Sequence, residues 1–169
     1  KKFAFGSADI KGVYFDEENR RHLNSIRLAY AQAGMNFAAA GRNEEARQML
    51  NKADKMMLES NIPYGMPSRN QQHNQIALQF AYAAYRAGDS TLGSKVSGAL
   101  KKDMEQQKAY YESLSGAKRD QLSLEEERND NLLRAVMSLE AEFKNKPVTS
   151  PETGGGTIQT VPPTDSPRK

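Results

Sequence analysis

Residues 30–57 decide the fold, and they read YAQAGMNFAAAGRNEEARQMLNKADKMM. Apolar and small residues recur at steps of three and four on both sides of Gly41, which is the period of an amphipathic helix. Glycine adopts the left-handed backbone that commonly ends a helix, and Asn43 followed by two glutamates is typical of a helix start. The stretch therefore predicts two helices joined by a tight turn.

Similar signals continue on both sides of this hairpin. Asp16 stands where its carboxylate can cap a first helix, and Gly88 with Asp89 separates a third helix from a fourth. Residues 68–71 (SRNQ) and 123–126 (SLEE) match the capping-box pattern, in which Ser precedes Gln or Glu by three positions. We expect these boxes to open the third and fifth helices.

The resulting prediction is an all-α fold of about five helices. It has an extended lead-in over residues 1–15 and a helical domain over residues 16–146. Within the domain we expect helix pairs at about 17–60 and 68–114, and a capping helix at about 120–145. Residues 147–169 are rich in Pro, Gly, Thr and Ser, so we expect this tail to be disordered.

The two predicted hairpins look like an internal repeat. Gly41 and Gly88 hold equivalent places, and each is followed five positions later by a small residue, Ala46 or Gly93. Small residues at matched positions let two helices approach closely. We therefore assign a structural role to five small residues: Gly34, Gly41, Ala46, Gly88 and Gly93.

The first unit resembles a tetratricopeptide repeat. That family places aromatic, glycine, alanine and large apolar residues at fixed offsets, and the matching positions here are Tyr30, Gly34, Phe37, Ala46, Leu50 and Ala53. The second unit keeps only Ala81 and Gly93, and Pro63 lies later than the family's proline. The resemblance implies stacked antiparallel helix-turn-helix units. An ordinary antiparallel bundle with glycine turns remains the alternative.

Composition excludes several classes of function. The 169 residues suffice for one domain, and no apolar run reaches the roughly 18 residues of a membrane span. The 24 basic and 21 acidic residues leave a net charge of +3 without a basic cluster, which argues against nucleic-acid binding. There is no Cys, so thiolate chemistry is excluded.

The sequence offers no candidate for catalysis. Its two histidines, His22 and His73, belong to no metal-binding motif, and we predict no catalytic residue, metal or cofactor. Arg20, Arg21 and Arg27 could bind an anion or lipid headgroups, but a solvated helix face paired with acidic residues is favoured.

Tyrosines give the best candidate for a binding surface. Tyrosine offers a large contact area and a hydroxyl at low entropic cost, and helical repeats bind partners in a concave groove. The candidate groove residues are Tyr64, Tyr82, Tyr85, Tyr110, Tyr111 and Arg27. The alternative is that about half of these tyrosines pack in the core or between helices.

A second resemblance covers residues 10–145. It rests on residues 13–21 (VYFDEENRR), 27–29 (RLA), 41–46 (GRNEEA), 62–64 (IPY) and 110–114 (YYESL). These stretches resemble the C-terminal soluble region of Bacteroidetes membrane proteins that carry an N-terminal domain of unknown function 2723. Those proteins are similar to membrane glycosyltransferases that use lipid-linked sugars. The resemblance implies a helical appendage whose catalytic membrane part is absent here.

Three functions follow as expectations. The first is a non-catalytic interaction or scaffolding domain, tethered to the bacterial inner membrane through a missing N-terminal part, with the periplasmic side favoured. The second is a free-standing adaptor that binds a protein or peptide, and a tyrosine-lined groove for a glycan is a variant of it. The third, a hydrolase or metal enzyme, needs converging ionisable side chains that the sequence does not offer. Because the chain starts with Lys1, we expect a piece or a processed product of a longer protein.

Overall fold

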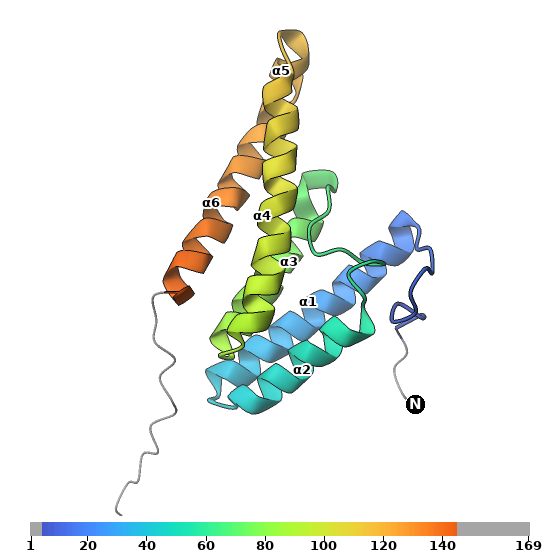
Figure 1. Cartoon of the computed structure of the whole chain (residues 1–169), viewed down its shortest axis with the longest axis vertical. Coiled ribbons are helices and arrows are strands. Elements are labelled where there is room, and N and C mark those ends of the chain that lie inside the picture. The colour runs from blue at the N-terminus through green and yellow to red at the C-terminus, as the bar shows by residue number, and fades with distance from the viewer. Residues whose placement is uncertain (1–4, 145–169) are drawn as a thin grey trace, which may run out of the picture.

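The structure, a computed structural model, describes residues 5–144. This part of the chain contains six α-helices, one 3-10 turn and no strand, which confirms the predicted all-α class (Figure 1). The helices are α1 (Glu17–Ala39), α2 (Asn43–Met56), α3 (Gln72–Arg86), α4 (Ser90–Ser113), α5 (Ala117–Gln121) and α6 (Ser123–Lys144), and the 3-10 turn η1 (Arg69–Gln71) precedes α3. The short α5 is the helix that the sequence did not predict.

The helices α1 and α2 form the predicted hairpin. Asp16 caps α1, because its Oδ1 accepts from the backbone N–H of Asn19 at 2.8 Å. Gly41 has φ 75°, the left-handed conformation expected at the turn. The two helices approach closely at Gly34, where an added Cβ would lie 2.9 Å from the side chain of Leu50. The absence of a side chain at Gly34 therefore sets the spacing of this pair.

The helices α3 and α4 repeat the same turn. Gly88 has φ 77°, and Asp89 Oδ1 accepts from the backbone N–H of Leu92 at 3.0 Å to cap α4. Gly93 lies against the ring of Tyr85, and a Cβ added at Gly93 would lie 2.8 Å from that ring. A glycine thus permits a close approach in each helix pair, but Gly34 lies before the turn of the first pair and Gly93 lies after the turn of the second.

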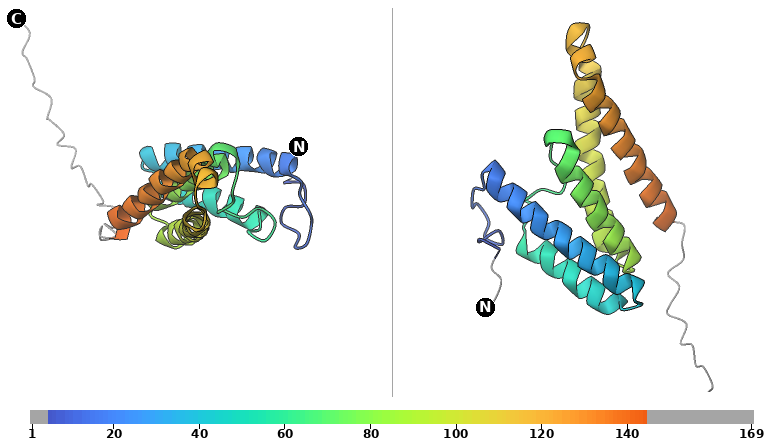
Figure 2. Two further views of the ribbon diagram at one scale, coloured as in Figure 1. Left: turned by 90° about the horizontal axis from the view of Figure 1, so that it is seen from above. Right: turned by 180° about the vertical axis from the view of Figure 1, so that it is seen from behind.

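The pairs stack through α1 and α3. The helix α1 packs on α2 and α3, α3 on α4, and α4 on α6 (Figures 1 and 2). The buried residues of this core include Ala31, Leu50, Ala53, Ala77, Phe80, Ala84, Val96, Leu100 and Val136. The helix α6 packs mainly on α4 and touches α3 only in part. The helix α6 therefore does not pack along α3 in the way that α3 packs along α1.

The described part of the lead-in, residues 5–15, is not extended, contrary to the prediction. It is a series of turns in which Gly6, Ser7 and Gly12 all have positive φ. Asn61 holds these turns in place, because its Nδ2 donates to the carbonyls of Ala8 at 3.0 Å and Ile10 at 2.7 Å. Phe5, Ala8 and Phe15 are buried in the core, and the Phe5 ring lies 5.8 Å from the ring of Tyr30 in α1.

Neither predicted capping box forms. Ser68 Oγ accepts from the backbone N–H of His73, and Gln71 adopts a left-handed backbone with φ 57°. At the second box, Ser123 Oγ donates to the carbonyl of Asp120, because α5 occupies the residues before it. Tertiary contacts and a preceding helix have displaced the local pattern in both places.

No helix within residues 5–144 is both long and apolar enough to cross a membrane. The prediction of a disordered tail at residues 147–169 lies outside the described residues.

Candidate functional site: the groove between α3 and α6

The structure does not bring the five tyrosines and Arg27 onto one surface. Tyr64, Tyr85 and Tyr111 are buried, whereas Tyr82 and Tyr110 are 38% and 56% exposed. The two exposed tyrosines lie on different helices, α3 and α4. This distribution corrects the expectation of a single groove lined by all of them, because the helix pairs use three of the rings for packing.

Arg27 is a buried structural residue. Its side chain is 1% exposed, so it does not belong to the solvated face predicted for it with Arg20 and Arg21. One terminal nitrogen donates to the carbonyl of Ile62 at 2.8 Å, and the other donates to the carbonyl of Pro63 and to Asn24 Oδ1, both at 3.1 Å. The guanidinium therefore holds the segment that connects the two helix pairs.

Tyr64 extends this cluster. The guanidinium carbon of Arg27 lies 4.3 Å from the Tyr64 ring centre, a cation–π contact. The Tyr64 hydroxyl donates to Asp54 Oδ1 at 2.8 Å, and Lys95 Nζ lies 2.5 Å from the same oxygen. Burial raises the pKa of Tyr64 and lowers that of Arg27. The cluster joins α1, α2, α4 and the connecting segment, which is a stabilising role.

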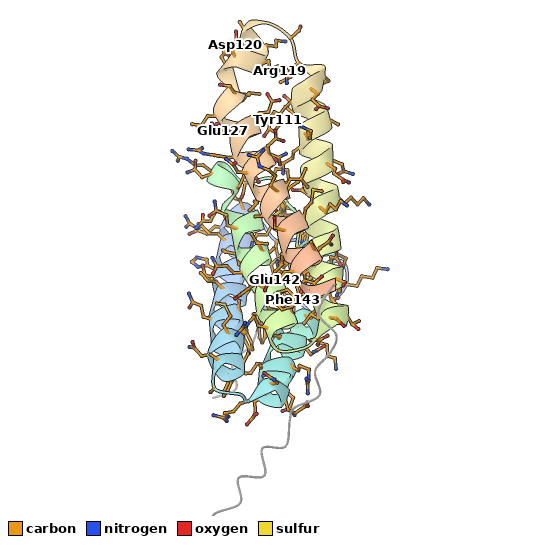
Figure 3. All side chains as sticks on the ribbon, turned by 90° about the vertical axis from the view of Figure 1, so that its left-hand side faces the viewer. Tyr111, Arg119, Asp120, Glu127, Glu142 and Phe143 are labelled. Carbon is orange, nitrogen blue, oxygen red and sulfur yellow. The ribbon has the colours of Figure 1, made fainter. Side chains whose placement is uncertain are left out.

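The remaining candidate tyrosines of α3 pack against the end of α6. The Tyr85 and Phe143 rings stack with their centres 5.1 Å apart, and Tyr82 meets Phe143 edge-on at 6.3 Å. The Tyr85 hydroxyl lies 3.2 Å from Ser97 Oγ, which donates to Glu140 at 2.8 Å. These contacts join α3, α4 and α6 at the C-terminal end of α6, labelled by Glu142 and Phe143 in Figure 3.

A groove lies between residues of α3 and η1 on one side and residues of α6 on the other. It consists of three hollows of about 330, 260 and 490 Å³. The first two share Gln71 and Arg128, and the last two share Ala135. We call this surface the α3–α6 groove.

The two ends of the α3–α6 groove differ in chemistry. The 330 Å³ end is the more polar one and is lined by Pro67, Ser68, Asn70, Gln71, Gln107, Tyr111, Glu125 and Arg128. The 490 Å³ end is mostly apolar and is lined by Leu78, Gln79, Tyr82, Ala135, Ser138, Leu139 and Glu142. A ligand that fits the whole groove must therefore combine apolar groups with hydrogen-bonding groups.

Hydrogen bonds between helices fix the polar end. Gln71 Nε2 donates to Gln107 Oε1 at 2.6 Å, and Asn74 Nδ2 donates to Gln71 Oε1 at 2.8 Å. Arg128 donates to Asn70 Oδ1 at 2.9 Å. Asn70 and Gln71 both have positive φ, at 56° and 57°, which is strained for side chains other than glycine. The network holds this strained turn in a defined shape.

Sequence reasoning missed most residues of this groove. Tyr82 and Tyr111 were predicted, but Leu78, Ala135 and Arg128 were not. A usable signal was present on α3, where Leu78 and Tyr82 stand one turn apart beside a face already filled by Ile76 and Phe80. A second apolar stripe on one helix indicates a second surface to be covered.

Other features of the described chain point to no chemistry. A 520 Å³ hollow on α2 is lined by residues of that helix alone. His22 is exposed and lies 3.7 Å from Glu18, whereas His73 is buried with its pKa lowered, mainly by burial. Among residues 5–144, no three His, Asp or Glu side chains are placed to hold a metal ion.

Comparisons of the chain with protein-family models, curated proteins and solved structures find no match.

Proposed function

We propose that this chain is a non-catalytic interaction domain that binds a polypeptide segment in the α3–α6 groove. The observation that supports this proposal is the change along one groove from an apolar to a polar end. Helices form most of the lining, and hydrogen bonds of the η1 turn to α4 and α6 hold the more polar end, so binding would order few protein groups.

The chemistry of the groove favours a peptide as the ligand. A peptide offers apolar side chains to Leu78, Tyr82 and Leu139, while its polar groups face the more polar end of the groove. A glycan ligand is less well supported, because only one aromatic ring among the residues that line the groove, that of Tyr82, is exposed to stack on a sugar.

We further propose that the domain serves as an appendage of a membrane-bound protein. Support for this context comes from the sequence resemblance to the membrane proteins with domain of unknown function 2723. A free-standing peptide adaptor would use the same groove, so the binding experiment below applies to both settings.

The test is a peptide selection followed by calorimetry with two matched variants. Peptides are selected from a displayed random library on the intact protein, and the best is titrated into wild type, Ala135→Glu and Ala141→Glu. Both alanines are exposed residues of α6, but only Ala135 lines the groove.

We expect A135E to weaken binding more than tenfold, because it puts a charge into the apolar end, and A141E to stay within about twofold of wild type. Equal affinities for the two variants would place the binding site elsewhere and refute the proposal.

A further inference from the structure

The apolar end of the α3–α6 groove lies next to the place where the described chain stops. Leu139, which lines this end, precedes Lys144 by five residues, or about 8 Å along a helix. Residues 145–169 follow Lys144. The covalent connection therefore limits how far the apolar groups of this tail can be from a hollow of about 490 Å³.

One part of the tail has the chemistry to fill this hollow. The large aliphatic residues among 145–169 are Val148, Ile158 and Val161, and two prolines follow Val161 directly. A proline restricts the residue before it to extended or polyproline II backbone. If these residues bind as a polyproline II helix, which has three residues per turn, Ile158 and Val161 fall on one side of it. Such segments dock on surfaces with exposed aromatic rings, and Tyr82 supplies one here.

The connecting residues are long enough for this contact. Thirteen residues, 145–157, separate Lys144 from Ile158, and they include Gly154, Gly155 and Gly156. A flexible chain of this length has a root-mean-square span of about 20 Å, which exceeds the roughly 8 Å from Lys144 back to Leu139. Tethering at this range gives an effective concentration on the order of 1 mM, so even a weak contact is populated.

We propose that residues 158–163 occupy the apolar end of the α3–α6 groove in the same molecule, with Ile158 and Val161 against Leu78, Tyr82 and Leu139. The tail then competes with an outside peptide for the groove. This competition rests on the proposed function, whereas the contact itself does not. The apparent affinity for the peptide then falls in proportion to the fraction of molecules whose groove is free.

The first experiment uses nuclear magnetic resonance on the full chain. Amide signals of wild type are compared with those of the double variant Ile158→Ser/Val161→Ser and of a matched tail variant, Val148→Ser. We expect the signals of Leu78, Tyr82, Ala135 and Leu139 to move in I158S/V161S and to stay unchanged in V148S. Unchanged signals in both variants would overturn the proposal. A difference that grows with protein concentration would also overturn it, since the tail of a second copy would then be the occupant.

The second experiment separates this inference from the proposed function. The peptide selected above is titrated into the same three full-length proteins. We expect it to bind I158S/V161S about threefold to tenfold more tightly than wild type, and V148S as wild type does. Equal affinities in all three would overturn the competition and leave the proposed function standing. If no peptide binds any of the three while the signal differences persist, the proposed function fails and the tail contact stands.

Discussion

Arg27 explains how a polar connection between two helix pairs can be buried. The carbonyls of Ile62 and Pro63 belong to no helix, and a carbonyl out of contact with water needs a donor. Arg27 supplies donors for both, and Tyr64 covers the guanidinium from one side. The guanidinium thus supplies several hydrogen-bond donors at once. The segment that it holds leads into the strained turn at the polar end of the groove.

Arg27→Ala should lower the free energy of unfolding by about 3 kcal/mol or more, because hydrogen bonds to charged groups contribute about 1.5–3 kcal/mol each and two carbonyls lose their donor. Urea unfolding followed by circular dichroism measures the change. Arg21→Ala is the control: Arg21 is exposed on the same helix, so its loss should change stability by less than about 0.5 kcal/mol. A similar loss in both variants would mean that Arg27 contributes little to the connection.

His73 should make stability depend on pH in a definite direction. Its side chain is buried, and burial together with the positive charges of Arg27 and Arg20 lowers its pKa below 6.5. As the pH falls below 6.5, His73 binds a proton in the unfolded chain before it does so in the folded chain. The protein therefore loses stability as the pH falls from 6.5 to the pKa of His73 in the folded state.

We therefore expect wild type to lose more stability than His73→Gln between pH 7.5 and 5. Urea midpoints at several pH values measure this, and the difference between the two proteins removes the contribution of the carboxylates. Parallel pH profiles for the two proteins would show that the pKa of His73 is the same in the folded and the unfolded state.

Among the helices, glycine has opposite roles at two interior positions. Gly34 lies in α1 against Leu50, whereas Gly98 lies in α4 with no atom within 4 Å of an added Cβ. Gly34→Ala should destabilise the protein by about 1–2 kcal/mol, because the overlap costs more than the roughly 1 kcal/mol gained in helix propensity.

Gly98→Ala meets no neighbour and should stabilise by about 0.5–1 kcal/mol, the propensity gain alone. Thermal or urea unfolding of the two single variants measures both changes. A stabilised G34A would show that α1 and α2 can separate without cost at this position, against the role assigned to Gly34.

The elements also show where sequence reasoning works. Asp16, Gly41, Gly88 and Asp89 act through neighbours four residues away or fewer, so their roles are readable from local sequence. The capping box at residues 68–71 fails because Gln71 is drawn to Gln107, 36 positions along the chain, and no local pattern encodes that contact. The α3–α6 groove was missed for the same reason, since its shape depends on the direction in which α6 leaves α4.

At the scale of the whole molecule, helices pack mostly on their neighbours in the stack. The order runs from α2 through α1, α3 and α4 to α6 (Figure 2). In such arrays stability is approximately a sum of units and nearest-neighbour interfaces, so one end can open while the other remains folded. The groove lies at the α6 end, and the stability of that end therefore determines how long the groove persists.

Val136→Ala tests this separation. Val136 is fully buried on α6, which packs mainly on α4, and truncating its side chain to that of alanine should cost about 1–2 kcal/mol. Amide hydrogen exchange should then become faster in α6 and along the adjoining part of α4, while α1 and α2 keep wild-type protection. Leu50→Ala is the corresponding change at the other end, a larger truncation that should cost about 2–5 kcal/mol and speed exchange in α1 and α2 first. If V136A instead raises exchange equally in all helices, the molecule opens as one cooperative unit. The groove would then be as stable as the core itself.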